Sequence, residues 1–166
     1  PTLKRLMTVA DAIAGWRQAG EWHTQRWSDS GFKNQAFTDF HEKLIKRGLD
    51  HGHIQLYQLC FGKVSVGFFY YLCDGAAARF YLQGVRPEAD GKLKPGLTAH
   101  CLLMQHFLEQ GLDYYDFMGG DSQYKRQLAD QRTEFVTVRV HNGALRHRIT
   151  DALRYVRGRL SRGSPQ

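Results

Sequence analysis

The chain has 166 residues, of which 42% are hydrophobic and 13% aromatic, enough for one folded domain with a buried core. No apolar run approaches the roughly 20 residues of a membrane span, and no hydrophobic signal opens the chain. Cys60, Cys73 and Cys101 lie in apolar runs without a CxxC pair, which predicts buried thiols rather than disulfides or metal ligands. We therefore expect a cytoplasmic protein without a membrane span or a metal.

The formal net charge of +7 is concentrated at the end of the chain. Residues 143–166 contain six arginines and one aspartate. Such a segment attracts nucleic acid, an acidic membrane surface or a phosphorylated ligand, and it is equally typical of a solvated helix face. Composition leaves these alternatives open.

The first 50 residues predict two helices. Apolar residues recur at helical spacing over residues 3–18, and again over residues 34–47, where Gly48 ends the pattern. Between them, residues 22–27 form an aromatic segment without a firm assignment, and residues 28–31 are a break.

The middle of the chain predicts three strands. Residues 54–61, 64–72 and 77–85 are rich in β-branched and aromatic side chains, and turns at Gly62-Lys63 and Asp74-Gly75 separate them. This pattern indicates an antiparallel meander.

The second half predicts alternating elements. A helix over residues 97–110 is followed by a strand over residues 112–118, which should pair parallel to the third strand through this helical crossover. A short helix over 124–129, a strand over 133–141 and a helix over 145–160 complete the chain. The order predicts an α/β (α+β) fold with a mixed sheet flanked by helices.

The start of the helix predicted over residues 97–110 is a candidate anion site. Pro95 favours the first helical position, and Gly96 lacks the Cβ that would keep a ligand from the backbone. The free amides of the first turn and the helix dipole attract phosphate, and Lys94 adds positive charge. The same residues are also compatible with an ordinary helix start.

The segment from Tyr114 to Lys125 is the second candidate. Gly119-Gly120 allows a sharp turn and the close approach of a ligand. Tyr124 is a candidate general acid, because a phenol can protonate a departing thiolate, and Lys125 could bind an anionic group. Asp116 is either a base or a structural hydrogen-bonding residue. The alternative for Tyr124 and Lys125 is a packed aromatic and a surface lysine.

These motifs together resemble the GNAT acyltransferase superfamily. The narrower resemblance is to its bacterial branch of cellulose-biosynthesis acetyltransferase-like proteins, related to Fem-type peptidoglycan-bridge aminoacyltransferases. It covers roughly residues 20–142. The motifs are His23-Thr24-Gln25-Arg26-Trp27, Phe40-His41, Pro95-Gly96 and Asp116-Phe117-Met118-Gly119-Gly120-Asp121-Ser122-Gln123-Tyr124-Lys125.

The resemblance implies a splayed, largely antiparallel sheet with one parallel pair. Acetyl-CoA or another acyl-CoA would lie in the splay, and its acyl group would pass directly to an amine or hydroxyl of an unknown acceptor. Tyr124 would lie near the sulfur. For such a transfer, the candidate bases that would take the acceptor's proton are Asp116, His23 and His41. The cofactor-binding residues would be Gln83, Gly84 and Val85 for the pantetheine arm, and Lys94, Pro95, Gly96, Leu97, Thr98 and Ala99 for the pyrophosphate.

The resemblance also implies a domain organisation. Members of this branch commonly hold two such domains in tandem, and this chain resembles the C-terminal one, with a second GNAT-like domain preceding it. We expect a helical N-terminal segment or linker over residues 1–31, the acyltransferase domain over 32–142, and a basic helix and tail over 143–166.

Two other functions stay open. An aminoacyl-tRNA donor, as in the Fem-type relatives, fits the arginine-rich end, because tRNA binding is electrostatic. A non-catalytic module of a larger protein fits the phosphate loop, which here is reduced to Pro95-Gly96 from the glycine-rich loop usual in the superfamily.

Overall fold

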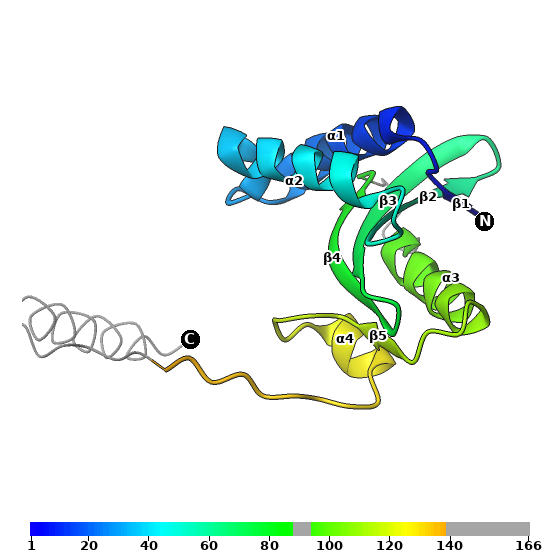
Figure 1. Ribbon diagram of the computed structural model, residues 1–166, viewed down its shortest axis with the longest axis vertical. Helices are drawn as coiled ribbons and strands as arrows, with labels where there is room; N and C mark the ends of the chain where they lie inside the picture. The colour runs from blue at the N-terminus through cyan, green and yellow to red at the C-terminus, as the bar shows by residue number, and fades with distance from the viewer. Residues whose placement is uncertain (88–93, 139–166) are drawn as a thin grey trace, which may run out of the picture. The chain divides into compact units, whose positions relative to one another are not determined.

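The computed structural model describes residues 1–87 and 94–138, and a compact unit spans Pro1–Ala129 (Figure 1). Its sheet has five strands in the order β1-β2-β3-β4-β5, all antiparallel neighbours except the parallel pair β4–β5. The mixed α/β fold is therefore confirmed. The elements are β1 Thr2–Arg5, α1 Val9–Arg26, the 3-10 helix η1 Gly31–Lys33, α2 Gln35–Gly48, β2 Ile54–Phe61, β3 Val64–Cys73, β4 Ala77–Val85, α3 Pro95–Glu109, β5 Tyr114–Asp116 and α4 Gln123–Leu128.

The helix predicted over residues 3–18 is wrong at its start. Residues Thr2–Arg5 form strand β1, which pairs with β2, and α1 begins only at Val9. The side chain of Thr8 accepts a hydrogen bond from the Asp11 N–H and so caps the helix there. Leu3 and Leu6 happen to continue the helical spacing, which is why the pattern alone placed the start too early.

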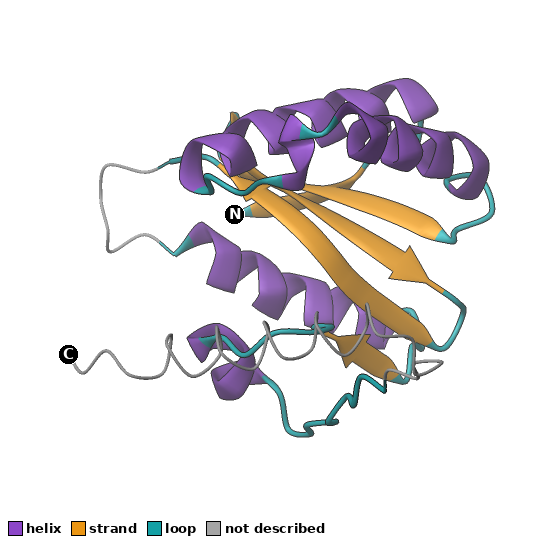
Figure 2. Cartoon of the chain, turned by 90° about the vertical axis from the view of Figure 1, so that its left-hand side faces the viewer, coloured by secondary structure: helices purple, strands orange, loops and turns teal. Residues whose placement is uncertain are grey.

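The sheet carries helices on both faces, as Figure 2 shows. α1 and α2 cover one face and α3 covers the other, so each face has its own hydrophobic cluster. Trp16, Ile45 and Tyr70 are central to the α1/α2 face, and Tyr71, Leu103 and Phe107 are central to the α3 face. No helix among the described residues is both long and apolar enough to cross a membrane.

The remaining elements follow the prediction, with three differences. α1 runs on to Arg26, past the end predicted at residue 18 and through most of the aromatic segment 22–27. β5 is limited to three residues, Tyr114–Asp116, instead of residues 112–118. The strand predicted over 133–141 is wrong for residues 133–138, which form no strand. Alternating side chains make a strand only beside a hydrogen-bonded neighbour, and the described sheet ends at β5. Residues 139–141 of that predicted strand, and the basic helix predicted over 145–160, lie outside the described residues.

Candidate functional site

The parallel strands β4 and β5 pair over three positions only. They pair at Ala77 with Tyr114, Ala78 with Tyr115 and Arg79 with Asp116. β4 then continues to Val85, while β5 ends at Asp116. Within the described residues, the second half of β4 therefore has no strand on the β5 side (Figure 2). This is the divergence that the resemblance implied.

The backbone of β4 turns polar groups toward that open side. The Arg86 N–H donates to the Val66 carbonyl in β3 at 2.9 Å. Because peptide groups in an antiparallel strand alternate in direction, those of Val85 and Gln83 point away from β3. The amides and carbonyls of these two residues can therefore pair with an extended ligand lying where a further strand would lie.

A β-bulge interrupts β4 just before this stretch. Tyr71 pairs with Phe80 and Tyr70 pairs with Leu82, so Tyr81 is the extra residue. The bulge lies two positions past the last β4–β5 pair, at the vertex of the divergence.

The N-terminus of α3 lies against this half of β4. The Thr98 N–H donates to the Lys94 carbonyl at 3.0 Å, so the amides of Gly96 and Leu97 lie ahead of the helical ladder. The Gln83 Oε1 atom is buried and has no hydrogen-bond partner among the described residues. A Cβ on Gly96 would lie 3.4 Å from that oxygen. The structure thus brings the two parts of the predicted cofactor site together.

Tyr124 lies on the α3 face of the sheet, stacked on His100. The two rings are 5.1 Å apart and within 8° of parallel, and Phe117 packs edge-on against Tyr124 at 5.8 Å. Burial raises the pKa of Tyr124, so the phenol holds its proton at neutral pH. A proton donor fixed by stacking is a suitable general acid.

His100 is a residue that the sequence prediction missed. Its side chain is only 1% exposed, and its Nδ1 lies 2.7 Å from the Tyr115 hydroxyl, which in turn is bonded to Tyr71. Burial, with a smaller contribution from the Lys125 charge, lowers the pKa of His100 to about 4. The only signal in the sequence was a histidine on the apolar stripe of α3, and such a histidine is equally typical of a packed core residue.

Asp116 and Lys125 make structural contacts. The Asp116 Oδ1 accepts from the Met118 N–H at 2.6 Å, and its Oδ2 lies 4.0 Å from the Arg79 Nε. The Lys125 ammonium donates to the carbonyls of Met118 and Gly119. These bonds hold the glycine turn, in which Gly120 has a φ of 95° that only glycine adopts readily.

The two candidate histidines lie on the α1/α2 side, across the sheet from Tyr124. The Nδ1 of His23 is 2.8 Å from the Ser30 hydroxyl, in the connection after α1. His41 in α2 is 2% exposed, and both ring nitrogens meet tyrosine hydroxyls: Tyr70 at 3.3 Å and Tyr81 at 3.2 Å. Of the two, only His41 is bonded to a side chain from β4.

Among the described residues, no group of three or more His, Cys, Asp or Glu side chains gathers where it could hold a metal ion. The prediction of buried cysteines is confirmed for Cys73, whereas Cys60 is only half-buried. It is wrong for Cys101, which is exposed because it lies on the outer side of α3.

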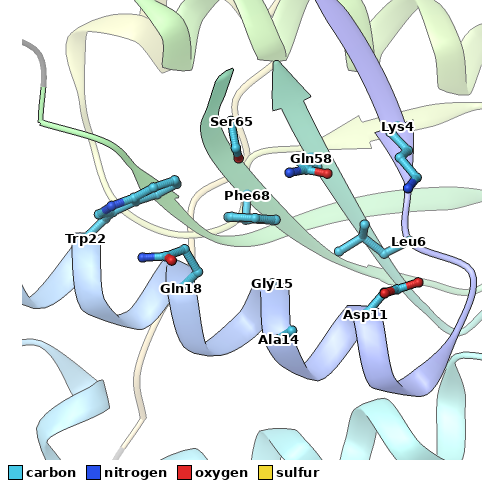
Figure 3. A pocket seen from close by; sticks show the side chains of 10 residues that line it. All are labelled: Lys4, Leu6, Asp11, Ala14, Gly15, Gln18, Trp22, Gln58, Ser65 and Phe68. Atoms are coloured by element: carbon cyan, nitrogen blue, oxygen red, sulfur yellow. The ribbon is translucent and has the colours of Figure 1, made fainter. Parts of the chain in front are cut away.

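A pocket of about 370 Å³ lies between α1 and strands β1–β3 (Figure 3). Trp22 and Phe68 form an apolar wall, with ring centroids 5.6 Å apart. Gln18, Gln58 and Ser65 contribute polar groups around it. The residues of the predicted cofactor site do not line this pocket.

The fold with these features is that of GNAT acetyltransferases. The chain matches the model of the acetyltransferase (GNAT) domain family over residues 2–126, and it belongs to that family. No curated protein sequence matches it.

Solved structures agree on the fold. A predicted acetyltransferase from Clostridium acetobutylicum, solved with acetyl-CoA, has a TM-score of 0.61 and 10% identity, over 83% of this chain and 95% of that one. The aminoglycoside N-acetyltransferase AAC(6')-Iy with CoA has a TM-score of 0.52 and 13% identity, over 85% and 94%. A ribosomal-protein-alanine N-acetyltransferase from Brucella melitensis biovar Abortus 2308 has a TM-score of 0.54 and 10% identity, over 84% and 100%.

Proposed function

We propose that the chain transfers an acetyl group from acetyl-CoA, or another acyl group from its CoA thioester, to an amine or hydroxyl. The observation that carries this proposal is the divergence of β4 from β5 beside the N-terminus of α3. Family membership supports it, and so does a structural neighbour that contains acetyl-CoA.

The CoA thioester would be held by the first turn of α3 and by the second half of β4. Its pyrophosphate lies on the first turn of α3, where the free amides and helix dipole attract an anion, with Lys94 adding charge. The residues of that turn are Lys94, Pro95, Gly96, Leu97, Thr98 and Ala99. The pantetheine arm runs along Gln83, Gly84 and Val85 and pairs with the peptide groups that face away from β3. The thioester then lies near the bulge.

The transfer needs no covalent intermediate on the protein. The acceptor nitrogen or oxygen attacks the thioester carbonyl, backbone amides of β4 stabilise the oxyanion, and the C–S bond breaks. Tyr124 gives its proton to the departing thiolate, because burial keeps the phenol protonated. The acceptor loses one proton to a base in the same step.

An amine is the acceptor class that we test first. Two structural neighbours are named for amine substrates, an aminoglycoside and the alanine of a ribosomal protein. The narrower relation to the cellulose-biosynthesis branch, the Fem-type tRNA donor, the preceding second domain, and the bacterial and cytoplasmic origin stay predictions.

The proposal is tested by calorimetric titration with acetyl-CoA. Gly96→Asp places a carboxylate where the pyrophosphate would bind, and we expect it to weaken binding by about 10-fold or more through like-charge repulsion. An aspartate in the first turn suits the helix dipole, so folding should be unharmed. Ala36→Asp introduces an aspartate at the same helical position, in the first turn of α2 at an exposed residue, and serves as the control for the added charge.

Saturable binding that Gly96→Asp weakens and Ala36→Asp leaves unchanged supports the cofactor site. If acetyl-CoA gives neither heat nor a thermal shift, the chain is a non-catalytic member of its family. Equal affinity in the wild type and in Gly96→Asp would place the phosphates elsewhere.

A further inference from the structure

Tyr81 occupies the one position in β4 that belongs to neither strand ladder. It is the extra residue of the bulge, two positions past the last pair with β5, and its side chain is only partly exposed. Its ring lies on the α1/α2 side of the sheet. An acceptor that approaches the thioester from that side meets Tyr81, while Tyr124 lies on the other side.

Behind Tyr81 lies a buried imidazole with a second phenol on its far nitrogen. The Nε2 of His41 is 3.2 Å from the Tyr81 hydroxyl, and its Nδ1 is 3.3 Å from the Tyr70 hydroxyl. Tyr70 is 2% exposed and cannot touch an acceptor. The row Tyr81–His41–Tyr70 therefore leads from the vertex of the divergence into the core.

We propose, on the basis of the acyl transfer proposed above, that Tyr81 receives the acceptor's proton while its own proton passes to Nε2 of His41. The arrangement requires the His41 tautomer that carries hydrogen on Nδ1, and Tyr70 fixes it by accepting that hydrogen bond. Tyr81 is then the catalytic residue, because it contacts the acceptor. His41 is a positioning residue that takes the Tyr81 proton, and Tyr70 holds His41 in the required tautomer.

The proton balance closes. The amine nitrogen forms a bond to the carbonyl carbon, the C–S bond breaks, and the nitrogen's proton goes to the Tyr81 oxygen. The Tyr81 proton goes to His41, which becomes an imidazolium, and the Tyr124 proton goes to the sulfur. Exchange with water then returns His41 and Tyr124 to their starting states, leaving an amide and free CoA thiol.

The surroundings of His41 suit a proton acceptor. Its ring is packed against Trp16 from α1, Phe37 and Phe40 from α2, Tyr70 from β3 and Tyr81 from β4. None of these carries a formal charge at neutral pH. The charged neighbours Arg17 and Glu42 form an ion pair with each other, so their charges offset. Burial lowers the pKa of His41, so the imidazole is neutral and available at pH 7.

The two tyrosines provide a matched pair of variants. Tyr81→Phe and Tyr70→Phe each remove one hydroxyl from the same imidazole, and only the first removes a group that the acceptor can reach. CoA release from acetyl-CoA is measured with an aminoglycoside, an alanine-initiated peptide and water alone as acceptors. The wild type should lose kcat/KM on the acid side, below the usual pKa of histidine, as His41 takes up a proton.

We expect Tyr81→Phe to lower kcat about 100-fold or more and to abolish the loss of kcat/KM at acid pH, with acetyl-CoA affinity unchanged. Tyr70→Phe should lower kcat by less than about 10-fold and keep the loss at acid pH. An equal fall of kcat in both variants, or a loss at acid pH that persists in Tyr81→Phe, overturns the proposed proton transfer from Tyr81 to His41. Binding of acetyl-CoA without turnover above the uncatalysed rate also overturns it, whereas absence of binding overturns the acyltransferase proposal itself.

Discussion

Gly84 of β4 lies directly against the backbone of Ala19 in α1. A Cβ built on Gly84 would overlap the carbonyl oxygen, Cα and carbonyl carbon of Ala19. The helix therefore rests on the strand with no side chain between them, and this contact fixes the strand along which we place the pantetheine arm. The glycine that the family resemblance marked as a cofactor contact thus has a structural reason as well.

Gly84→Ala should destabilise the protein, because the added methyl meets backbone atoms that cannot move aside. We expect a loss of about 3 kcal/mol in the free energy of unfolding, the upper range for overpacking. Urea denaturation measures it. Gly119→Ala is the control, since a Cβ there meets nothing within 4 Å, and it should change stability by less than about 0.5 kcal/mol. Equal stability of the two variants would mean that α1 does not contact β4 in this way.

Tyr124→Phe keeps the aromatic ring that stacks on His100 and removes only the hydroxyl. Since general acid catalysis contributes about 100-fold or more, kcat should fall by that factor while acetyl-CoA affinity is unchanged. CoA release and calorimetric titration measure the two quantities. Unchanged turnover would remove Tyr124 from the mechanism.

Stability should fall in mild acid because of His100. Its pKa is about 4 in the folded protein and 6.5 in the unfolded chain, so between these values the unfolded chain binds more protons. Lowering the pH from about 7 to about 5 should therefore cost about 2 kcal/mol from this residue alone. Urea denaturation at both pH values measures the difference.

His100→Gln should reduce that difference between the two pH values by about 2 kcal/mol, the share of His100, and His51→Gln, at an exposed histidine, should leave it unchanged. The comparison is between pH values within one variant, so a general loss of stability in His100→Gln does not affect it. A pH dependence that is undiminished in His100→Gln would assign the effect to other groups.

The sequence was most informative where local patterns suffice. Two turns and the apolar alternation located β2, β3 and β4, and the helical crossover predicted the parallel pairing of β4 with β5. The start of the chain was harder, because Leu3 and Leu6 fit helical spacing although Thr2–Arg5 pair with β2. Strand pairing over more than 50 residues of sequence leaves no local signal.

The candidate site was predictable in part. Gly96 came from the Pro95-Gly96 motif and Gln83 from what the family resemblance implies, and the structure brings them together. Tyr81 and His100 could not be assigned from sequence, since their roles depend on a β-bulge and on stacking between α3 and α4. For His41 the sequence offered a base and could not show that a tyrosine stands between it and the open side of β4.

The most direct test of the account is amide hydrogen exchange in β4 with and without acetyl-CoA. If the pantetheine arm lies where β5 has diverged, exchange at Gln83 and Val85 should slow when acetyl-CoA binds. The Gly84 amide, which faces β3, should change little and provides an internal control. Bound acetyl-CoA that leaves exchange at Gln83 and Val85 unchanged would contradict the account.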